Sequence, residues 1–218
     1  MNIIICEGKY DAIFFDELSK ENTQKYIMYD VDFKKLQKCM GRSLDYFKVA
    51  YPLIIYGDGG KPKIYKALEK AVGLTLGKSK DNIYISLILD DDGNEYDDLE
   101  VKVKDILDSL SKNKDRFSRP PTFEQNNRGF ILKYPKSEGS TIVSLFTVPL
   151  NLEIQVAKKC IENKPHPHIN VDANPHLAID FLADNHYDGN KELLFRETSL
   201  LLKNEIWANA ILNQMNSG

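Results

Sequence analysis

The chain has 218 residues, of which 42% are hydrophobic, and this suits one medium-sized domain whose core needs no disulfide or structural metal. Its three widely spaced cysteines, Cys6, Cys39 and Cys160, include no CxxC pair, so we expect a reducing, cytoplasmic setting rather than a disulfide-rich secreted protein. No apolar run approaches the ~18 residues of a membrane span, so we expect no membrane partner. The net charge of −3 neither indicates nor excludes nucleic acid as a partner.

Strands and helices are predicted to alternate along the first half of the chain. The apolar run from Asn2 to Cys6 predicts a buried strand, and Asp11 is expected to cap the helix that follows. Gly73 is expected to end a later helix, which begins near Pro62. Three strand–helix repeats are typical of a parallel sheet covered by helices on both faces. The predicted strands are residues 2–6, 52–56 and 82–89, and the predicted helices are residues 12–20, 32–40, 44–50, 62–72 and 96–110.

The second half is predicted to complete this sheet and to add further helices. The polar segment 113–128, which contains two consecutive prolines, is expected to be a loop. We therefore expect an α/β protein in which residues 1–112 form the core, and residues 113–218 form sheet-completing strands and a C-terminal helical extension in one compact unit with it. The predicted strands here are residues 130–134 and 141–148, and the predicted helices are residues 152–161, 176–183 and 192–215.

Carboxylates follow two of the predicted strands at the point where those strands end. Glu7 follows the first strand, and Asp90 and Asp92 follow the third. In an open parallel sheet, ligands bind beyond the carboxyl ends of the strands, and the alternation of an extended chain would point Asp90 and Asp92 the same way. Such a group of oxygen ligands needs a cation, and Mg²⁺ suits it. The alternative is that Asp90 to Gly93 forms only a turn, since Asp and Gly favour turns.

A glycine-rich turn, residues 57–61, follows the second predicted strand. Backbone N–H groups of Gly59 and Gly60 could approach a phosphate at the start of the next helix, with Lys61 adding a positive charge. The spacing is neither that of a P-loop nor that of a dinucleotide fingerprint. The alternative is a strand-to-helix turn that needs glycine for a positive φ angle, and the sequence leaves both alternatives open.

The order of these segments resembles the Toprim family. The segment Ile-Ile-Cys-Glu7-Gly8-Lys-Tyr-Asp11 resembles the first Toprim motif, a strand followed by Glu-Gly-x-x-Asp. The segment Leu-Ile-Leu-Asp90-Asp-Asp92-Gly resembles the second motif, a strand followed by Asp-x-Asp. Between them, the glycine-rich turn looks like that of Toprim proteins near the OLD-type nuclease branch. The resemblance covers the first half of the chain, with the motifs in the expected order.

The resemblance implies a metal-dependent activity on nucleic acid. It makes Glu7 a general acid/base or a metal ligand, and it makes Asp90 and Asp92 the residues that hold Mg²⁺, with Mn²⁺ as an alternative ion. A Pro…Leu-Glu segment similar to that of stand-alone Toprim proteins adds Glu153 as a candidate ligand. The alternative role for Glu153 is an acidic residue favoured by the dipole in the first turn of a helix. Asp11 belongs to the first motif, and is either a site residue or a helix cap.

Three hypotheses about function follow. The first is a Mg²⁺-dependent nuclease or phosphotransferase that acts on the phosphodiesters of DNA or RNA. The second is a Toprim fold without chemistry that binds nucleic acid, a nucleotide or a partner protein, which the acidic balance and the early Gly93 favour. The third is a subunit of a primase or repair complex. The apolar stripe of the predicted C-terminal helix packs either against the sheet or against a partner protein or a second copy of the chain.

Overall fold

The structure is a computed structural model that describes residues 1–22, 24–29, 52–57, 59–78, 80–113, 119–126, 129–166 and 169–216. The helices predicted over residues 32–40 and 44–50 lie outside the described residues, as does Cys39.

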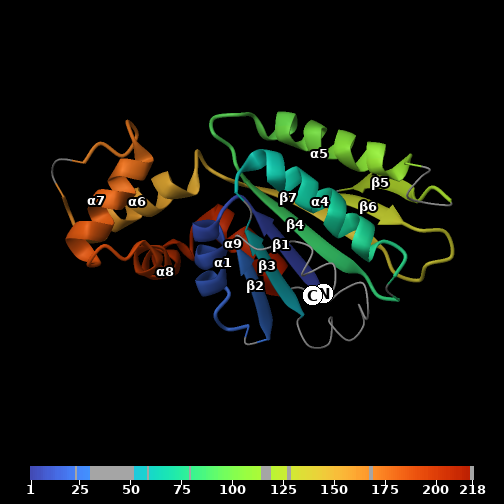
Figure 1. Ribbon diagram of the computed structural model, residues 1–218, viewed down its shortest axis with the longest axis horizontal. Coiled ribbons are helices and arrows are strands. Elements are labelled where there is room, and N and C mark those ends of the chain that lie inside the picture. The colour runs from blue at the N-terminus through green and yellow to red at the C-terminus, as the bar shows by residue number, and fades with distance from the viewer. Residues whose placement is uncertain are drawn as a thin grey trace.

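A seven-stranded sheet in the order β2-β3-β1-β4-β7-β6-β5 forms the middle of the fold (Figure 1). The strands from β2 to β7 in this order are parallel, and β6 and β5 add an antiparallel edge. The expected α/β class, with a largely parallel sheet flanked by helices, is confirmed. The strands are β1 (Asn2–Cys6), β2 (Lys25–Tyr29), β3 (Leu53–Gly57), β4 (Ile83–Asp90), β5 (Thr122–Asn126), β6 (Gly129–Lys133) and β7 (Thr141–Val148).

The composition of β1 explains its central place in the sheet. All five of its residues are buried, because β3 and β4 pair with it on either side and helices cover both faces. A parallel strand buried on both faces has a continuous apolar sequence rather than an alternating one. The buried strand predicted over residues 2–6 is confirmed.

Helices cover both faces of the sheet and extend beyond one side of it (Figure 1). α4 and α5 share one hydrophobic core with the sheet, whereas α1, α6, α7, α8 and α9 share the other. None of the helices in the described part of the chain is long and apolar enough to cross a membrane. The helices are α1 (Lys9–Leu18), α4 (Lys61–Thr75), α5 (Tyr96–Ser111), α6 (Leu152–Asn163), α7 (Pro175–His186), α8 (Lys191–Leu202) and α9 (Ile206–Asn216).

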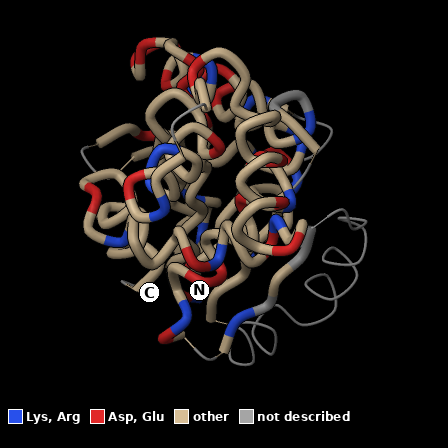
Figure 2. The backbone as a smooth tube through the Cα atoms, turned by 90° about the vertical axis from the view of Figure 1, so that its left-hand side faces the viewer, with Lys and Arg blue, Asp and Glu red and all other residues tan. Residues whose placement is uncertain are grey.

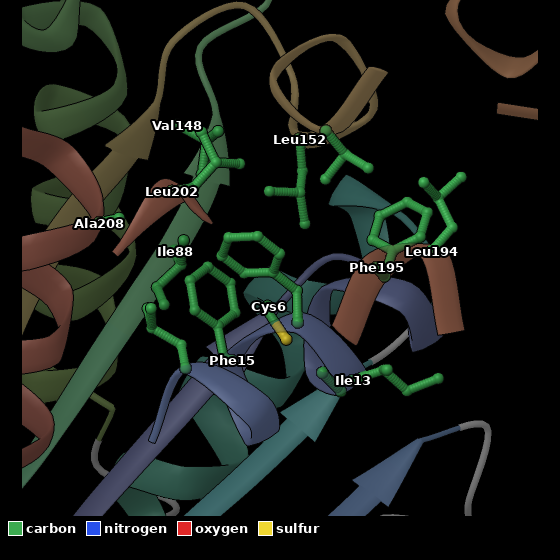
Figure 3. Packing of buried hydrophobic residues seen from close by; sticks show 14 of the residues in the cluster. Cys6, Ile13, Phe15, Ile88, Val148, Leu152, Leu194, Phe195, Leu202 and Ala208 are labelled. Carbon is green, nitrogen blue, oxygen red and sulfur yellow. The ribbon is translucent and has the colours of Figure 1, made fainter. Parts of the chain in front are cut away.

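The second of these cores joins the C-terminal helices to the ends of the central strands. Figure 3 shows Leu152 of α6 and Phe195 of α8 in one cluster with Cys6 of β1 and Ile13 of α1. Each of these four side chains is at most 1% exposed, and truncating a buried side chain of the size of Leu152 to alanine costs about 2–5 kcal/mol. This packing fixes the start of α6 next to the end of β1.

Asp16 ties α8 to α1 and β2 through ion pairs. Its carboxylate lies 2.7 Å from Lys25 Nζ and accepts a 2.9 Å hydrogen bond from Arg196 Nη1. Because Asp16 is only 8% exposed, its charge is largely desolvated and needs these partners. The C-terminal helical group is therefore held against the helix that carries Asp11.

The start of α1 differs from the prediction. The helix begins at Lys9, and Gly8 occupies the N-cap position without a side-chain hydrogen bond. The Ala12 N–H already donates to the Gly8 carbonyl at 3.1 Å, so the first turn closes before Asp11 could cap it. Asp11 lies inside the first turn, and the prediction that it caps the helix is wrong.

The end of α4 is also later than predicted. The helix continues through Gly73 and ends at Thr75. A glycine inside a helix costs only ~1 kcal/mol relative to alanine, and the buried residues on either side of it, Val72 and Leu74, pack against the sheet. The Thr75 hydroxyl also lies 3.1 Å from the Thr141 hydroxyl of β7, which holds the last turn in place.

The predicted C-terminal helix over residues 192–215 is two helices, α8 and α9. In one continuous helix, residue 206 would share a face with Ser199 and Leu202, which are buried. Ile206 is instead 90% exposed, and the chain turns after Leu202 so that Ala208 and Ile211 can be buried separately. Hydrophobic periodicity alone did not reveal this break.

The segment 113–128, predicted as a loop, contains β5. This strand is polar and mostly exposed, so it lacks the apolar pattern by which buried strands are recognised. Its backbone pairing with β6 forms it, and such an edge strand depends on a neighbour that is close only in the folded protein.

Candidate carboxylate site at the carboxyl end of β1

The candidate site lies where the strand order reverses. From β1 the chain passes through α1 to β2 and then to β3 on one side, and from β3 through α4 to β4 on the other side of β1. Ligands of open α/β sheets bind at such a switch point, beyond the carboxyl ends of the strands. The structure brings Glu7, the turn after β3 and Asp90 to this edge, as the sequence predicted.

Glu7 and Asp90 are joined through backbone hydrogen bonds. The Asp90 N–H donates to Glu7 Oε1 at 3.0 Å, and the Leu152 N–H donates to Asp90 Oδ1 at 3.0 Å. The Gly60 N–H donates to the backbone oxygen of Glu7 at 2.9 Å. The ends of β1 and β4, the turn after β3 and the start of α6 therefore converge on two carboxylates.

Asp11 and Glu153 complete a group of four acidic side chains, which we call the carboxylate cluster: Glu7, Asp11, Asp90 and Glu153. Burial, and then the charges of Glu153 and Glu7, raise the pKa of Asp11 to about 8. Burial, and then the charges of Asp11, Glu7 and Glu153, raise the pKa of Asp90 to about 9. Each shift means that negative charge at this edge is insufficiently compensated, so the cluster favours protons or a cation.

Asp92 was expected to point the same way as Asp90, but the extended chain on which this expectation relied ends at Asp90. β4 ends at Asp90, and Asp92 is exposed with a φ of 47°, so the alternation of an extended strand no longer applies. Asp91 organises the turn, because its Oδ1 accepts hydrogen bonds from the N–H groups of Gly93 at 2.9 Å and Leu150 at 2.7 Å. The turn alternative therefore describes residues 91–93, whereas Asp90 belongs to the cluster.

Two glycines allow the turn after β3 to approach Glu7. A Cβ atom at Gly57 would lie 2.3 Å from the backbone oxygen of Gly8, so no larger residue fits without moving the chain. Gly60 has a φ of 91°, a conformation that favours glycine, and its N–H is directed to Glu7. Gly60 therefore fits the turn alternative better than a direct phosphate contact.

Three lysines near this edge differ in their surroundings. A Cβ atom at Gly59 would lie 3.1 Å from Lys63 Nζ, which places this amine beside the turn. Lys9 Nζ lies 2.6 Å from Glu192 Oε1 of α8, so its charge is paired with the C-terminal helices. Lys61 begins α4, and its side chain lies outside the described part of the structure. Lys63 is thus a described lysine whose amine lies beside the turn.

The carboxylate cluster has the donor chemistry for Mg²⁺ but not the arrangement of a finished metal site. Over the described ranges, no group of three or more His, Cys, Asp and Glu side chains is arranged to hold a metal ion. Glu7 and Asp90 each direct one oxygen to a backbone N–H. Mg²⁺ takes carboxylate oxygens and keeps several waters, so the residue types fit this ion, and binding would require these side chains to turn.

Comparisons with models of protein families, with curated proteins and with solved structures gave no match for this chain. The Toprim resemblance therefore stays a prediction from the motif residues.

The resemblance placed Glu153 of α6 at this site, but the hydrogen bond from the Leu152 N–H to Asp90 was not expected from the sequence. Asn151 caps α6 by accepting a 2.8 Å hydrogen bond from the Ile154 N–H, and this cap aims the Leu152 N–H at Asp90. An asparagine immediately before an apolar helix was an available signal. That the helix would start against β4 depended on packing between distant segments, for which the sequence contains no local signal.

Proposed function

We propose that this protein is a Mg²⁺-dependent nuclease or phosphotransferase that acts on nucleic-acid phosphodiesters at the carboxylate cluster. The observation that carries the proposal is the convergence of four acidic side chains at the switch point of the sheet, where burial and the neighbouring charges raise the pKa values of two of them, Asp11 and Asp90. Enzyme sites collect such perturbed groups because burial and like charges tune them for ion binding or proton transfer.

Each residue has a distinct part in this proposal. Asp90, Asp11 and Glu153 would hold the ion, and Mg²⁺ bound there would supply an activated water and offset charge on the phosphate. Glu7 would share the ion or move a proton, because it follows the central strand and is tied to Asp90. Lys63 would contact a phosphate oxygen. Asp92 is given no ligand role, since it is exposed in the turn.

The test is cleavage of labelled single- and double-stranded DNA and RNA in Mg²⁺, in Mn²⁺ and in EDTA. We expect cleavage by the wild type in either metal, and a loss of at least ~100-fold in Glu7→Gln and Asp90→Asn, because even outer-shell changes at metal sites cost ~10–100-fold. Asp92→Asn is the matched control and should retain activity. Cleavage that persists in EDTA, or in Asp90→Asn, would contradict the proposal.

A second candidate function is a non-catalytic module that binds nucleic acid or a partner protein, alone or as a subunit of a repair or primase complex. It is favoured by the backbone hydrogen bonds that occupy oxygens of Glu7 and Asp90. The interspersed acidic and basic residues in Figure 2 do not argue for an extended phosphate-binding face on the side shown. Nucleic-acid binding without cleavage, and without any stabilisation by Mg²⁺, would select this candidate.

A further inference from the structure

A cavity of about 820 Å³ lies beside β7, and none of its lining residues belongs to the carboxylate cluster. Its size falls within the range of small-molecule binding pockets. Its walls come from both halves of the chain. It is lined by Tyr84, Tyr96, Glu100, Gln125, Asn126, Gly129, Ile142, Ser144, Leu145, Phe146 and Gln214.

The cavity arises because β6 pairs with only the first part of β7. The register ends at Phe130 opposite Val143, whereas β7 continues for five more residues along β4 to Val148. Gly129, the first residue of β6, lies so close to β7 that a Cβ atom there would be 2.2 Å from the Val143 oxygen. The pairing of β6 with β7 therefore stops short of the end of β7, and residues of α5 and α9 also line the cavity.

The described lining residues favour a planar ligand that carries hydrogen-bonding groups. Three of them are aromatic, Tyr84, Tyr96 and Phe146, and three others carry side-chain amides. Glu100 is the one charged residue among the described lining residues, so these residues offer amide and carboxylate partners for a base edge. Aromatic rings that stack on bases, together with polar groups that bond base edges, are how proteins hold unstacked nucleotides.

Tyr96 is the aromatic residue best placed to stack on a ligand. Its hydroxyl donates to the Leu145 carbonyl at 3.4 Å, while the residue remains 44% exposed. Desolvation, and then the charges of Glu100 and Asp97, raise the pKa of the Tyr96 hydroxyl, so it stays protonated and keeps this bond. The ring is thus held at one end and accessible to solvent.

The cavity is close to the carboxylate cluster along the sheet. Phe146 pairs with Ile88, two residues before the pair of Val148 with Asp90, and two residues of a strand span about 7 Å. Tyr96 begins α5 immediately after the turn that follows Asp90. A ligand at the Phe146 end of the cavity would therefore lie within about 7 Å, along the strand, of the pair that contains Asp90.

We propose that this cavity binds one unstacked nucleoside of a single-stranded nucleic acid whose neighbouring phosphate lies at the carboxylate cluster. This inference rests on the proposed function and names its substrate class. It predicts that the protein requires a base next to the bound phosphate, and that it binds single strands more tightly than duplexes, in which bases are stacked and paired.

The test compares the affinity of the protein for a fluorescent single-stranded oligonucleotide and for the same strand with abasic sites, with Ca²⁺ in place of Mg²⁺. In the wild type, we expect the strand with bases to bind at least tenfold more tightly, since one base stacked on an aromatic side chain contributes on the order of tenfold or more. Tyr96→Ala should bring the ratio of the two affinities, with bases over abasic, close to one. Tyr96→Phe keeps the ring and should preserve this affinity ratio. Val101→Ala, an exposed change on the same helix outside the cavity, is the matched control.

The outcomes separate this inference from the proposed catalysis. A ratio near one in the wild type, an unchanged ratio in Tyr96→Ala, or no binding of either strand would overturn the inference. Cleavage by the wild type together with any of these results would leave the catalytic proposal standing and remove only the nucleoside site. A high ratio that depends on Tyr96, without any cleavage in Mg²⁺ or Mn²⁺, would support the nucleoside site and count against catalysis.

Discussion

Replacing Asp90 with asparagine should stabilise the metal-free protein at alkaline pH while removing its response to Mg²⁺. The asparagine keeps the size of the side chain and an oxygen to accept the N–H of Leu152 at the position that Asp90 Oδ1 now occupies. It removes a charge that burial and three neighbouring carboxylates disfavour. Residues that hold a ligand are often costly to stability in its absence, so a stabilising substitution here would reveal that cost.

The pH dependence follows from the direction of the pKa shift. The pKa of Asp90 is about 9 in the folded protein, against 3.8 for an ordinary aspartate. Between these values the folded protein binds more protons than the unfolded chain, so the free energy of unfolding falls as the pH rises. Each pH unit in this range changes the free energy of unfolding by at most ~1.4 kcal/mol for one group. Between pH 5 and pH 8, Asp90 can therefore lower the free energy of unfolding of the wild type by at most about 4 kcal/mol. Because Asp11 shares the same protons, we expect the advantage of Asp90→Asn to grow by about 2 kcal/mol.

Urea denaturation in EDTA at pH 5 and at pH 8 measures this difference, with Asp92→Asn as the control that removes an exposed carboxylate of the neighbouring turn. Mg²⁺ at 100 times its dissociation constant should then stabilise the wild type by about 2.7 kcal/mol, but not Asp90→Asn. The reasoning that the charge of Asp90 destabilises the folded protein would be refuted by either of two results: an Asp90→Asn variant less stable than the wild type at pH 8, or a stability difference between the two proteins that does not change with pH. An equal effect of Mg²⁺ on both proteins would remove Asp90 from the metal site.

Three other predictions concern the scaffold that positions the cluster. Gly57→Ala should lower the free energy of unfolding by at least ~2 kcal/mol in urea denaturation, because its Cβ would lie 2.3 Å from a backbone oxygen of the loop after β1. Unchanged stability would mean that the two backbone segments are not held this close together. Asp16→Asn should cost about 1–3 kcal/mol by the same measurement, because Lys25 and Arg196 lose their buried partner, and an increase in stability would contradict the role of this ion pair. Burial raises the pKa of Cys6 well above its usual range. Cys6 should therefore stay unmodified by iodoacetamide in the folded protein and react after unfolding, as measured by peptide mass spectrometry. Rapid labelling of the folded protein would show that the end of β1 is accessible to solvent.

The regular elements that bury continuous apolar runs could be predicted from the sequence. β1, β3 and β4 lie within one residue of their predicted bounds, and β7 matches at both ends, because a strand covered on both faces is uniformly apolar. Elements that depend on a partner could not be predicted in this way. β5 is polar and forms through pairing with β6, and the break before α9 is set by which side chains the core can accommodate.

The candidate site divides in the same manner. Glu7 and Asp90 were identifiable because each stands at the end of a buried strand, and the topology of a parallel sheet brings such ends together. The place of Asp92 could not be predicted, because the chain forms a turn there with a positive φ angle, whereas the prediction assumed an extended chain. Asp11 was ambiguous, since the sequence does not state at which residue the first turn of α1 closes.

By itself, the sequence determined the α/β class, the alternation of its core elements and the edge of the sheet at which acidic residues collect, because these follow from local periodicity and from strand ends. Only the tertiary structure decided which carboxylates become neighbours, how strongly burial perturbs Asp11 and Asp90, and that a cavity lined by Tyr96 opens beside them. Charge interaction and desolvation depend on distances between segments far apart in the chain, and those distances exist only after α6 and β7 have packed against β4.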